Sequence, residues 1–214
     1  MLKIDNYTAG YTASNYLFQK VSLEIPPKCV VGIKGTNGCG KSTFIKGLIN
    51  LAPVKKGVIL LNGVDISNWE TAKIFQTKQI GYLSQRDRVF GHLTVSENIQ
   101  MYRYYSRDKK LPDSGISKKL LAIIESKQDF LASTLSGGEQ LILGLYCLEI
   151  LNPDILLLDE PSDSLDSNFK TILIDLINDW KVAGKGILLV EQNLEILNMM
   201  TNNIITLNRY DEFN

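Results

Sequence analysis

A glycine-rich segment at residues 35–43 has the residue types and spacing of a phosphate-binding loop. It reads G-T-N-G-C-G-K-S-T, which matches the pattern G-x-x-x-x-G-K-[ST]. The glycines let backbone N–H groups turn toward a phosphate, Lys41 can contact the β- and γ-phosphates, and Ser42 can offer its hydroxyl to Mg²⁺. A chance glycine turn is the alternative, which the flanking strand and helix patterns disfavour. We expect nucleotide contacts from Gly35, Thr36, Asn37, Gly38, Cys39, Gly40, Lys41, Ser42 and Thr43.

Two carboxylates, Asp159 and Glu160, follow the apolar run at residues 155–158. Such a run is typical of a strand inside a covered parallel sheet, and open α/β sheets bind ligands at the C-terminal ends of their strands. We expect Asp159 to reach Mg²⁺ through water and Glu160 to polarise the water that attacks the γ-phosphate. An acidic pair that only ends a strand is the alternative, and the phosphate loop disfavours it.

A third motif, L-S-G-G-E-Q, occupies residues 135–140. Ser136 is a good helix cap, and two glycines in the first turn would leave backbone N–H donors open to an anion. Taken alone, this hexapeptide predicts only the start of a helix.

The elements that must position these residues follow from apolar patterning. The runs at residues 30–33, 155–158 and 187–190 predict buried parallel strands, and helices are expected at residues 41–51 and 169–180, the latter capped by Asp166 or Ser167. Alternation at residues 2–5 and 21–25 predicts half-exposed antiparallel strands, and residues 95–133 have a helical period. We predict one α/β domain over residues 1–214, with a helical subdomain inserted at about residues 87–150.

Composition excludes several classes of protein. The chain has 214 residues, 44% of them hydrophobic, and equal numbers (23 each) of basic and acidic residues, so neither disorder nor electrostatic capture of nucleic acid is expected. The three cysteines have no metal-ligand spacing and suit a reducing compartment. Residues 1–15 contain no apolar core of a signal peptide, and no apolar stretch of the chain is long enough for a membrane span. We expect a cytoplasmic protein that reaches membranes only through a partner.

In their order along the chain, the three motifs closely resemble those of ATP-binding cassette (ABC) ATPases, and the resemblance covers nearly the whole chain. The resemblance implies a P-loop NTPase core, an N-terminal antiparallel β subdomain and an inserted helical lobe. It also implies roles for Gln85 as the Q-loop glutamine, which senses Mg²⁺, and for Tyr11, which would stack on adenine. Tyr7 and Tyr16 compete with Tyr11 for that role. The signature would be Leu135, Ser136, Gly137, Gly138, Glu139 and Gln140, and the D-loop Ser164, Leu165 and Asp166.

The switch position of this family usually holds a histidine, but here it is Gln192. An amide can donate a hydrogen bond to a γ-phosphate but carries no positive charge. Because Glu160 is present, we expect hydrolysis to survive. The one histidine, His92, is expected in an exposed loop. Cys39 is either a redox-sensitive thiol or a small residue of which only the backbone matters, and we favour the second.

A narrower resemblance is also present: four segments are similar to the ATPase subunits of branched-chain amino-acid and urea importers, namely residues 65–73, 88–90, 93–98 and 189–193. In the simpler interpretation, Trp69 is a hydrophobic anchor and Thr94 opens a helix.

The ABC resemblance implies the cofactors ATP and Mg²⁺ and a head-to-tail dimer, because each ATP lies between the phosphate loop of one subunit and the signature of another. The partner in this dimer is either a second copy of the chain or a paralogue. A membrane permease is the other implied partner, and it would hold the chain at the inner face of the membrane. We therefore expect the ATPase motor of a transporter. The alternatives are a soluble assembly or remodelling ATPase, such as one for iron–sulfur clusters, and a regulatory nucleotide-binding module with little turnover.

Overall fold

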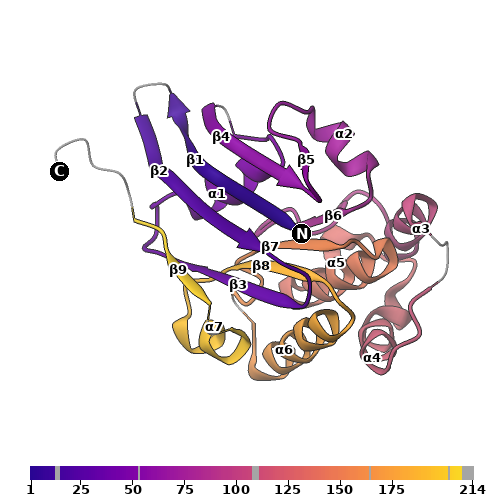
Figure 1. Ribbon diagram of the computed structural model, residues 1–214. Coiled ribbons are helices and arrows are strands. Elements are labelled where there is room, and N and C mark those ends of the chain that lie inside the picture. Colours follow the sequence, from indigo (N-terminus) through magenta and orange to yellow (C-terminus); the bar gives the residue numbers. More distant parts are fainter. Residues whose placement is uncertain (13–14, 53, 108–110, 164, 202, 209–214) are drawn as a thin grey trace.

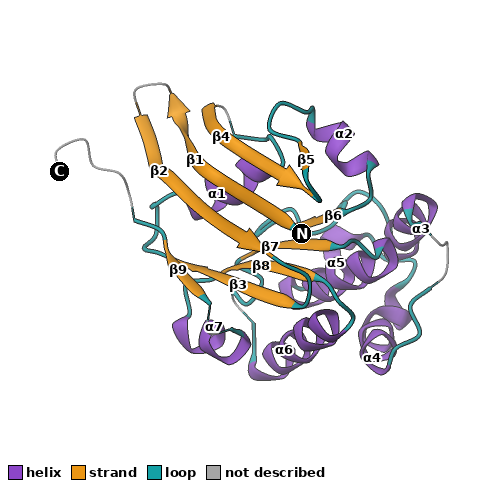
Figure 2. Cartoon of the chain, in the orientation of Figure 1, coloured by secondary structure: helices purple, strands orange, loops and turns teal. Residues whose placement is uncertain are grey.

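The computed structural model describes residues 1–12, 15–52, 54–107, 111–163, 165–201 and 203–208 as two sheets flanked by helices (Figures 1 and 2). The strands are β1 (Leu2–Thr12), β2 (Asn15–Ile25), β3 (Cys29–Lys34), β4 (Val54–Leu61), β5 (Val64–Asp65), β6 (Ile80–Leu83), β7 (Ile155–Asp159), β8 (Gly186–Val190) and β9 (Ile204–Thr206). The helices are α1 (Lys41–Leu48), α2 (Thr71–Gln76), α3 (Val95–Tyr105), α4 (Gly115–Ile124), α5 (Gly137–Leu151), α6 (Ser167–Val182) and α7 (Leu194–Met200). Two short 3₁₀ turns, Glu125–Lys127 and Ala132–Thr134, precede α5.

A five-stranded parallel sheet, in the order β6-β7-β8-β3-β9, forms the centre of the fold. Every residue of β7 and β8 is buried, as the continuous apolar runs predict. Successive side chains of β7 point to opposite faces: Leu156 and Leu158 pack with the helices, whereas Ile155 and Leu157 pack with the antiparallel sheet. The carboxyl ends of these strands therefore meet at one edge of a sheet that is covered on both sides.

The antiparallel sheet, in the order β2-β1-β4-β5, covers one face of the parallel sheet together with α1 (Figure 1). Its pairing confirms the prediction of antiparallel strands near the N-terminus. The buried rings of Tyr7, Phe18 and Phe44 pack between this sheet and α1, with ring centroids 5.2–5.8 Å apart. The phosphate loop thus begins at β3 in one sheet and leads into a helix fastened to the other.

Helices dominate the segment between β6 and β7. Thr94 begins α3 with a capping box, since its side chain accepts from the N–H of Glu97 while the Glu97 carboxylate accepts from the N–H of Thr94. α5 is buried along residues 141–148 because α3 and α4 pack against it on one side and the sheet on the other. That this segment is a separate subdomain stays a prediction. In the described residues, no helix combines the length and apolar character needed to cross a membrane.

One helix end differs from the sequence prediction, and the structure decides between the two caps predicted for another helix. α1 ends at Leu48 rather than at residue 51, because Asn50 takes a left-handed conformation (φ 61°) and its amide donates to the carbonyls of Ile66 and Trp69 at 3.0 and 2.6 Å. Of the two candidate caps for α6, Asp166 is the one used: its carboxylate accepts from the N–H of Phe169 at 2.9 Å.

Replacing Gly47 by alanine is expected to destabilise the fold by about 2 kcal/mol, although alanine favours helices. A Cβ atom there would lie 1.7 Å from the Tyr7 hydroxyl, and the packed aromatic rings leave Tyr7 no room to move. Thermal or urea unfolding of the purified chain measures the effect.

Two controls accompany this prediction. Gly115→Ala at the start of α4, where a Cβ would meet no atom within 4 Å, should be neutral or slightly stabilising. Tyr7→Phe removes a hydroxyl that is buried without a hydrogen-bond partner among the described residues. Because the ring carbon that carried it would still lie 2.9 Å from the new Cβ, Tyr7→Phe/Gly47→Ala should recover part of the loss. A double variant no more stable than Gly47→Ala alone would show that the clash with the hydroxyl is not the cause.

Candidate nucleotide-binding site

The phosphate loop connects β3 to α1 through residues 35–40. Gly40, at the N-terminal end of α1, has φ 104°, a conformation that L side chains rarely adopt. Gly35 leaves no space for a side chain, because a Cβ atom would lie 2.5 Å from the sulfur of Cys39 and 2.6 Å from the carbonyl oxygen of Leu207. Gly40 is therefore required by its backbone conformation and Gly35 by the lack of space around it, and Cys39 is a buried small residue within the loop.

Lys41 curls back over its own loop. Its ammonium donates to the carbonyl oxygens of Gly35 and Thr36 at 3.0 and 3.2 Å and forms an ion pair with Glu160 Oε1 at 3.3 Å. The side chains of Lys41 and Glu160 are only 5% and 6% exposed. Each buried charge therefore depends on the other, and phosphate oxygens entering the loop would compete for the same ammonium.

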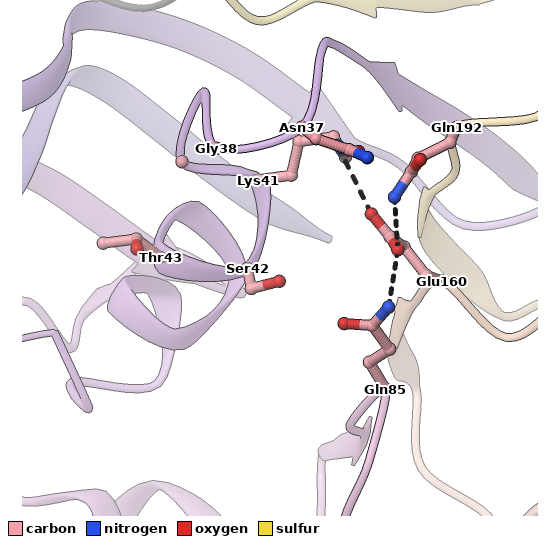
Figure 3. A pocket seen from close by; sticks show the side chains of 9 residues that line it. Asn37, Gly38, Lys41, Ser42, Thr43, Gln85, Glu160 and Gln192 are labelled. Carbon is pink, nitrogen blue, oxygen red and sulfur yellow. Dashed lines mark hydrogen bonds and ion pairs between the residues drawn. The ribbon is translucent and has the colours of Figure 1, made fainter. Parts of the chain in front are cut away.

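Glu160 is the meeting point of three strand ends (Figure 3). Its Oε2 atom accepts from Gln85 Nε2 and from Gln192 Nε2, each at 2.8 Å, and the two amides approach from opposite sides. Gln85 follows β6, Glu160 follows β7 and Gln192 lies just beyond β8, so the parallel order of these strands brings together residues far apart in sequence. The backbone of Glu160 is left-handed (φ 48°), a conformation that is uncommon for a residue other than glycine.

Asp159, the last residue of β7, lies beside the phosphate loop. Its Oδ1 accepts from the Ser42 hydroxyl at 3.2 Å, and the residue is 1% exposed. Burial raises the pKa of Asp159, and the nearby Glu160 carboxylate adds to this, whereas the Ser42 hydrogen bond opposes it. A hydroxyl and a carboxylate side by side are hard oxygen donors of the kind that Mg²⁺ prefers, so this pair could hold that ion next to a phosphate.

Residues of the phosphate loop and the glutamines and Glu160 that meet it line one pocket of about 330 Å³. Its walls are Asn37, Gly38, Gly40, Lys41, Ser42, Thr43, Gln85, Glu160 and Gln192. All nine were predicted as site residues from the sequence. None of the signature residues is among them.

The signature forms the start of α5. Ser136 caps the helix in a reciprocal arrangement with Glu139, whose other carboxylate oxygen pairs with Lys127 at 2.5 Å. Ser136 and Gly137 are exposed, and a Cβ on Gly137 would meet nothing within 4 Å. This helix start therefore presents its N–H groups to the outside rather than to the pocket of its own chain.

The side chain of Tyr11 and all of Ser164 lie outside the described residues. The two tyrosines that compete with Tyr11 are engaged elsewhere: Tyr7 is 1% exposed, and the Lys56 ammonium lies 5.3 Å from the centroid of the Tyr16 ring. In the D-loop, Leu165 is buried and Asp166 caps α6.

Trp69 and His92 lie outside the site, as a hydrophobic anchor and an exposed loop residue would. Trp69 packs against the core with Lys73 over its ring, and His92 is exposed beside Phe90.

Two charged residues near the site, Arg88 and Glu191, were assigned no role from the sequence, although both lie in the segments 88–90 and 189–193. Arg88 donates to the carbonyl of Gly137 at 3.2 Å, which links the segment after Gln85 to the signature helix. Glu191, directly before Gln192, is buried and accepts from the N–H of Ser162 at 2.9 Å. The position of this acidic residue next to Gln192 was the one feature of the sequence that could have pointed to a role for Glu191.

A phosphate loop between a strand and a helix, with an acidic pair at the end of a nearby parallel strand, defines a P-loop nucleotide-binding protein. The sequence profile described as "ABC transporter" matches residues 18–163. The chain therefore belongs to the ABC transporter family, as an ATP-hydrolysing, nucleotide-binding subunit. The soluble remodelling factor considered from the sequence is disfavoured.

Two relatives illustrate the similarity. A probable branched-chain amino acid transport ATP-binding protein, LivF, of Archaeoglobus fulgidus is 36% identical over 202 residues, which are 91% of this chain and 83% of the relative. The manganese transport system ATP-binding protein MntB of Bacillus subtilis is 32% identical over 204 residues, 91% of this chain and 78% of the relative.

Solved structures share the fold. The post-hydrolysis dimer of the ATP-binding cassette MJ0796, bound to ADP and Pi, superposes with a TM-score of 0.81 at 23% identity and covers 97% of this chain and 94% of that one.

Asp159→Asn is expected to raise Tm by about 2–4 °C near pH 7 without nucleotide, because the wild-type charge is buried at a cost. The folded pKa lies above its ordinary value of 3.8, so the penalty is absent below that value and develops as the pH rises through the folded pKa. Hydrolysis should fall by about a hundredfold or more if Asp159 helps hold Mg²⁺. The exposed Asp175→Asn is the matched control. A lower Tm for Asp159→Asn at pH 7 would contradict the burial argument.

Proposed function

We propose that two cassettes close head to tail on two ATP molecules and reopen after hydrolysis. Each ATP would lie between residues 35–43 of one subunit and the signature, residues 135–140, of the other. The observation that carries this proposal is the composition of the pocket, which gathers the phosphate loop, Gln85, Glu160 and Gln192 while the signature helix start faces outward. The partner is a second copy of the chain or a paralogous cassette.

The chain's own residues divide the work of the site. The Lys41 ammonium leaves the Gly35 and Thr36 carbonyls and binds phosphate oxygens. Ser42, Asp159 and Gln85 would hold Mg²⁺, which when bound neutralises phosphate charge. Tyr11 would stack on adenine, and Ser164, Leu165 and Asp166 would cross the subunit interface.

Glu160 becomes the base once Lys41 turns to phosphate. Its carboxylate then keeps the two neutral amide donors, Gln85 and Gln192, and can accept a hydrogen bond from the attacking water. Gln192 is also placed to donate to the γ-phosphate. Since an amide does not titrate, catalysis depends on Glu160 rather than on a charged switch residue.

The permease is proposed to dock at an apolar groove between α2 and α3. This groove has a volume of about 520 Å³, and its lining includes Phe75 from α2, Phe90, and Met101, Tyr102 and Tyr105 from α3. Phe90 lies five residues after Gln85, so a cytoplasmic permease helix seated there would be linked to the catalytic pocket through one short segment. The chain would then sit at the inner face of the membrane through its permease.

The direction of transport is proposed to be import. Relatives named as import ATP-binding proteins for phosphonates, methionine and Fe(3+) ions support this proposal. The 36% identity to a branched-chain amino acid protein agrees with the narrower resemblance at residues 65–73 and 189–193. We infer an importer of the amino-acid type, in which other subunits select the solute.

Glu160→Gln is expected to bind ATP, to lose hydrolysis by at least about a hundredfold and to accumulate as a dimer on a sizing column with ATP and Mg²⁺. The amide keeps the size of the side chain but cannot take a proton from water. The wild-type chain with ATP, and the variant with ADP, should elute as monomers. Hydrolysis at the wild-type rate would show that Glu160 is not the base.

The same tagged variant, purified with ATP and Mg²⁺ from detergent-solubilised membranes of the native host, should bring a multi-spanning permease with it. Mass spectrometry would name that permease and its solute class. A soluble assembly in its place would contradict the transport proposal while leaving the nucleotide site intact.

A further inference from the structure

Glu191 is a buried carboxylate that the reaction described above does not use. It lies between the end of β8 and Gln192 and is 2% exposed. Burying a carboxylate is costly unless hydrogen bonds satisfy it. Glu191 Oε1 accepts from the backbone N–H of Ser162 at 2.9 Å, and the Ser162 hydroxyl also hydrogen-bonds to this carboxylate. The backbone N–H of Glu191 itself donates to the carbonyl of Ile33, at the end of β3, at 3.1 Å.

Ser162 belongs to the turn that carries Glu160. That turn starts from the left-handed backbone of Glu160, a conformation that surrounding structure must hold in place for a non-glycine residue. Two further backbone contacts fix it: the N–H of Glu160 donates to the carbonyl of Val190 at 2.9 Å, and the N–H of Asp163 donates to the carbonyl of Glu160 at 3.3 Å. Ser162 is 5% exposed, so water cannot easily replace Glu191 as the acceptor.

The charges around Glu191 come from two other loops. The Glu160 carboxylate, after β7, repels it, and the half-buried Arg88 guanidinium, after β6, attracts it. Burial raises the pKa of Glu191 to about 6, while the hydrogen bonds from Ser162 act in the opposite direction. Glu191 is thus an anion at neutral pH and a neutral acceptor in mild acid.

We propose that Glu191 is a positioning residue for Glu160: by holding the Ser162 N–H, it fixes the turn that aims the Glu160 carboxylate at the attacking water. This inference rests on the proposed role of Glu160 as the base. It separates two functions of neighbouring residues, because Gln192 contacts the Glu160 carboxylate directly whereas Glu191 acts through the backbone two residues further on. A misaimed base loses rate even when the nucleotide binds normally.

The test compares Glu191→Ala and Glu191→Gln in the full-length chain, with kcat and KM for ATP measured between about pH 5 and 8. Glu191→Ala leaves a buried donor unpaired, so kcat should fall about thirtyfold with KM within about threefold of wild type. Glu191→Gln keeps a neutral acceptor, so kcat should fall only about fivefold at pH 8. The exposed Glu195→Gln, in the first turn of α7, is the matched control and should behave as wild type.

The pH profile separates positioning from a merely structural role. Protonated wild-type Glu191 resembles the glutamine variant, so the ratio of wild-type to Glu191→Gln kcat should fall from about five to about one as the pH drops through about 6. A ratio that does not change with pH, or wild-type kcat in Glu191→Ala, would overturn the inference. If Glu191→Ala does not fold, the glutamine ratio still decides. Full activity in Glu160→Gln would instead show that the proposed base is wrong.

Discussion

The ion pair between Lys41 and Glu160 is the interaction on which the site depends. Both side chains are almost fully buried, and an isolated buried charge would be strongly destabilising. The pair joins the phosphate loop to the end of β7, and the amides of Gln85 and Gln192 satisfy the second carboxylate oxygen from the ends of β6 and β8. A phosphate group that draws Lys41 away therefore changes the environment of Glu160 directly, which would couple nucleotide binding to the state of the proposed base.

The arrangement of layers makes this coupling possible. Because residues 155–158 of β7 fill two buried cores and Asp159 follows them directly, a slip by one residue would misplace side chains in both cores or draw the Asp159 carboxylate into apolar surroundings. The register that satisfies both cores also places Asp159 opposite Val190 and Glu160 just beyond the sheet edge. The site is thus aligned by apolar packing several residues away from any reacting group.

Much of this could be predicted from the sequence, because the phosphate loop, the buried strands and the capping residues are local patterns with local causes. Other features depend on contacts between distant segments. The end of α1 is set by Asn50 reaching Ile66 and Trp69, and the burial of Tyr7 is decided by packing against Phe18 and Phe44. Ser162 lies 29 residues before Glu191, so their hydrogen bond had no signal in the sequence beyond an acidic residue at an unusual place.

The central claim, that the signature of one chain serves the phosphate loop of another, is tested most directly by mixing two inactive variants. One carries Lys41→Ala and the other Gly137→Asp, each purified and shown to lack hydrolysis. In the mixed dimer, one site would combine an intact phosphate loop with an intact signature, so hydrolysis should return, whereas the wild type mixed with the double variant gains no such site. A mixture of the two single variants that stays inactive, although mixed dimers form with ATP, would contradict the account.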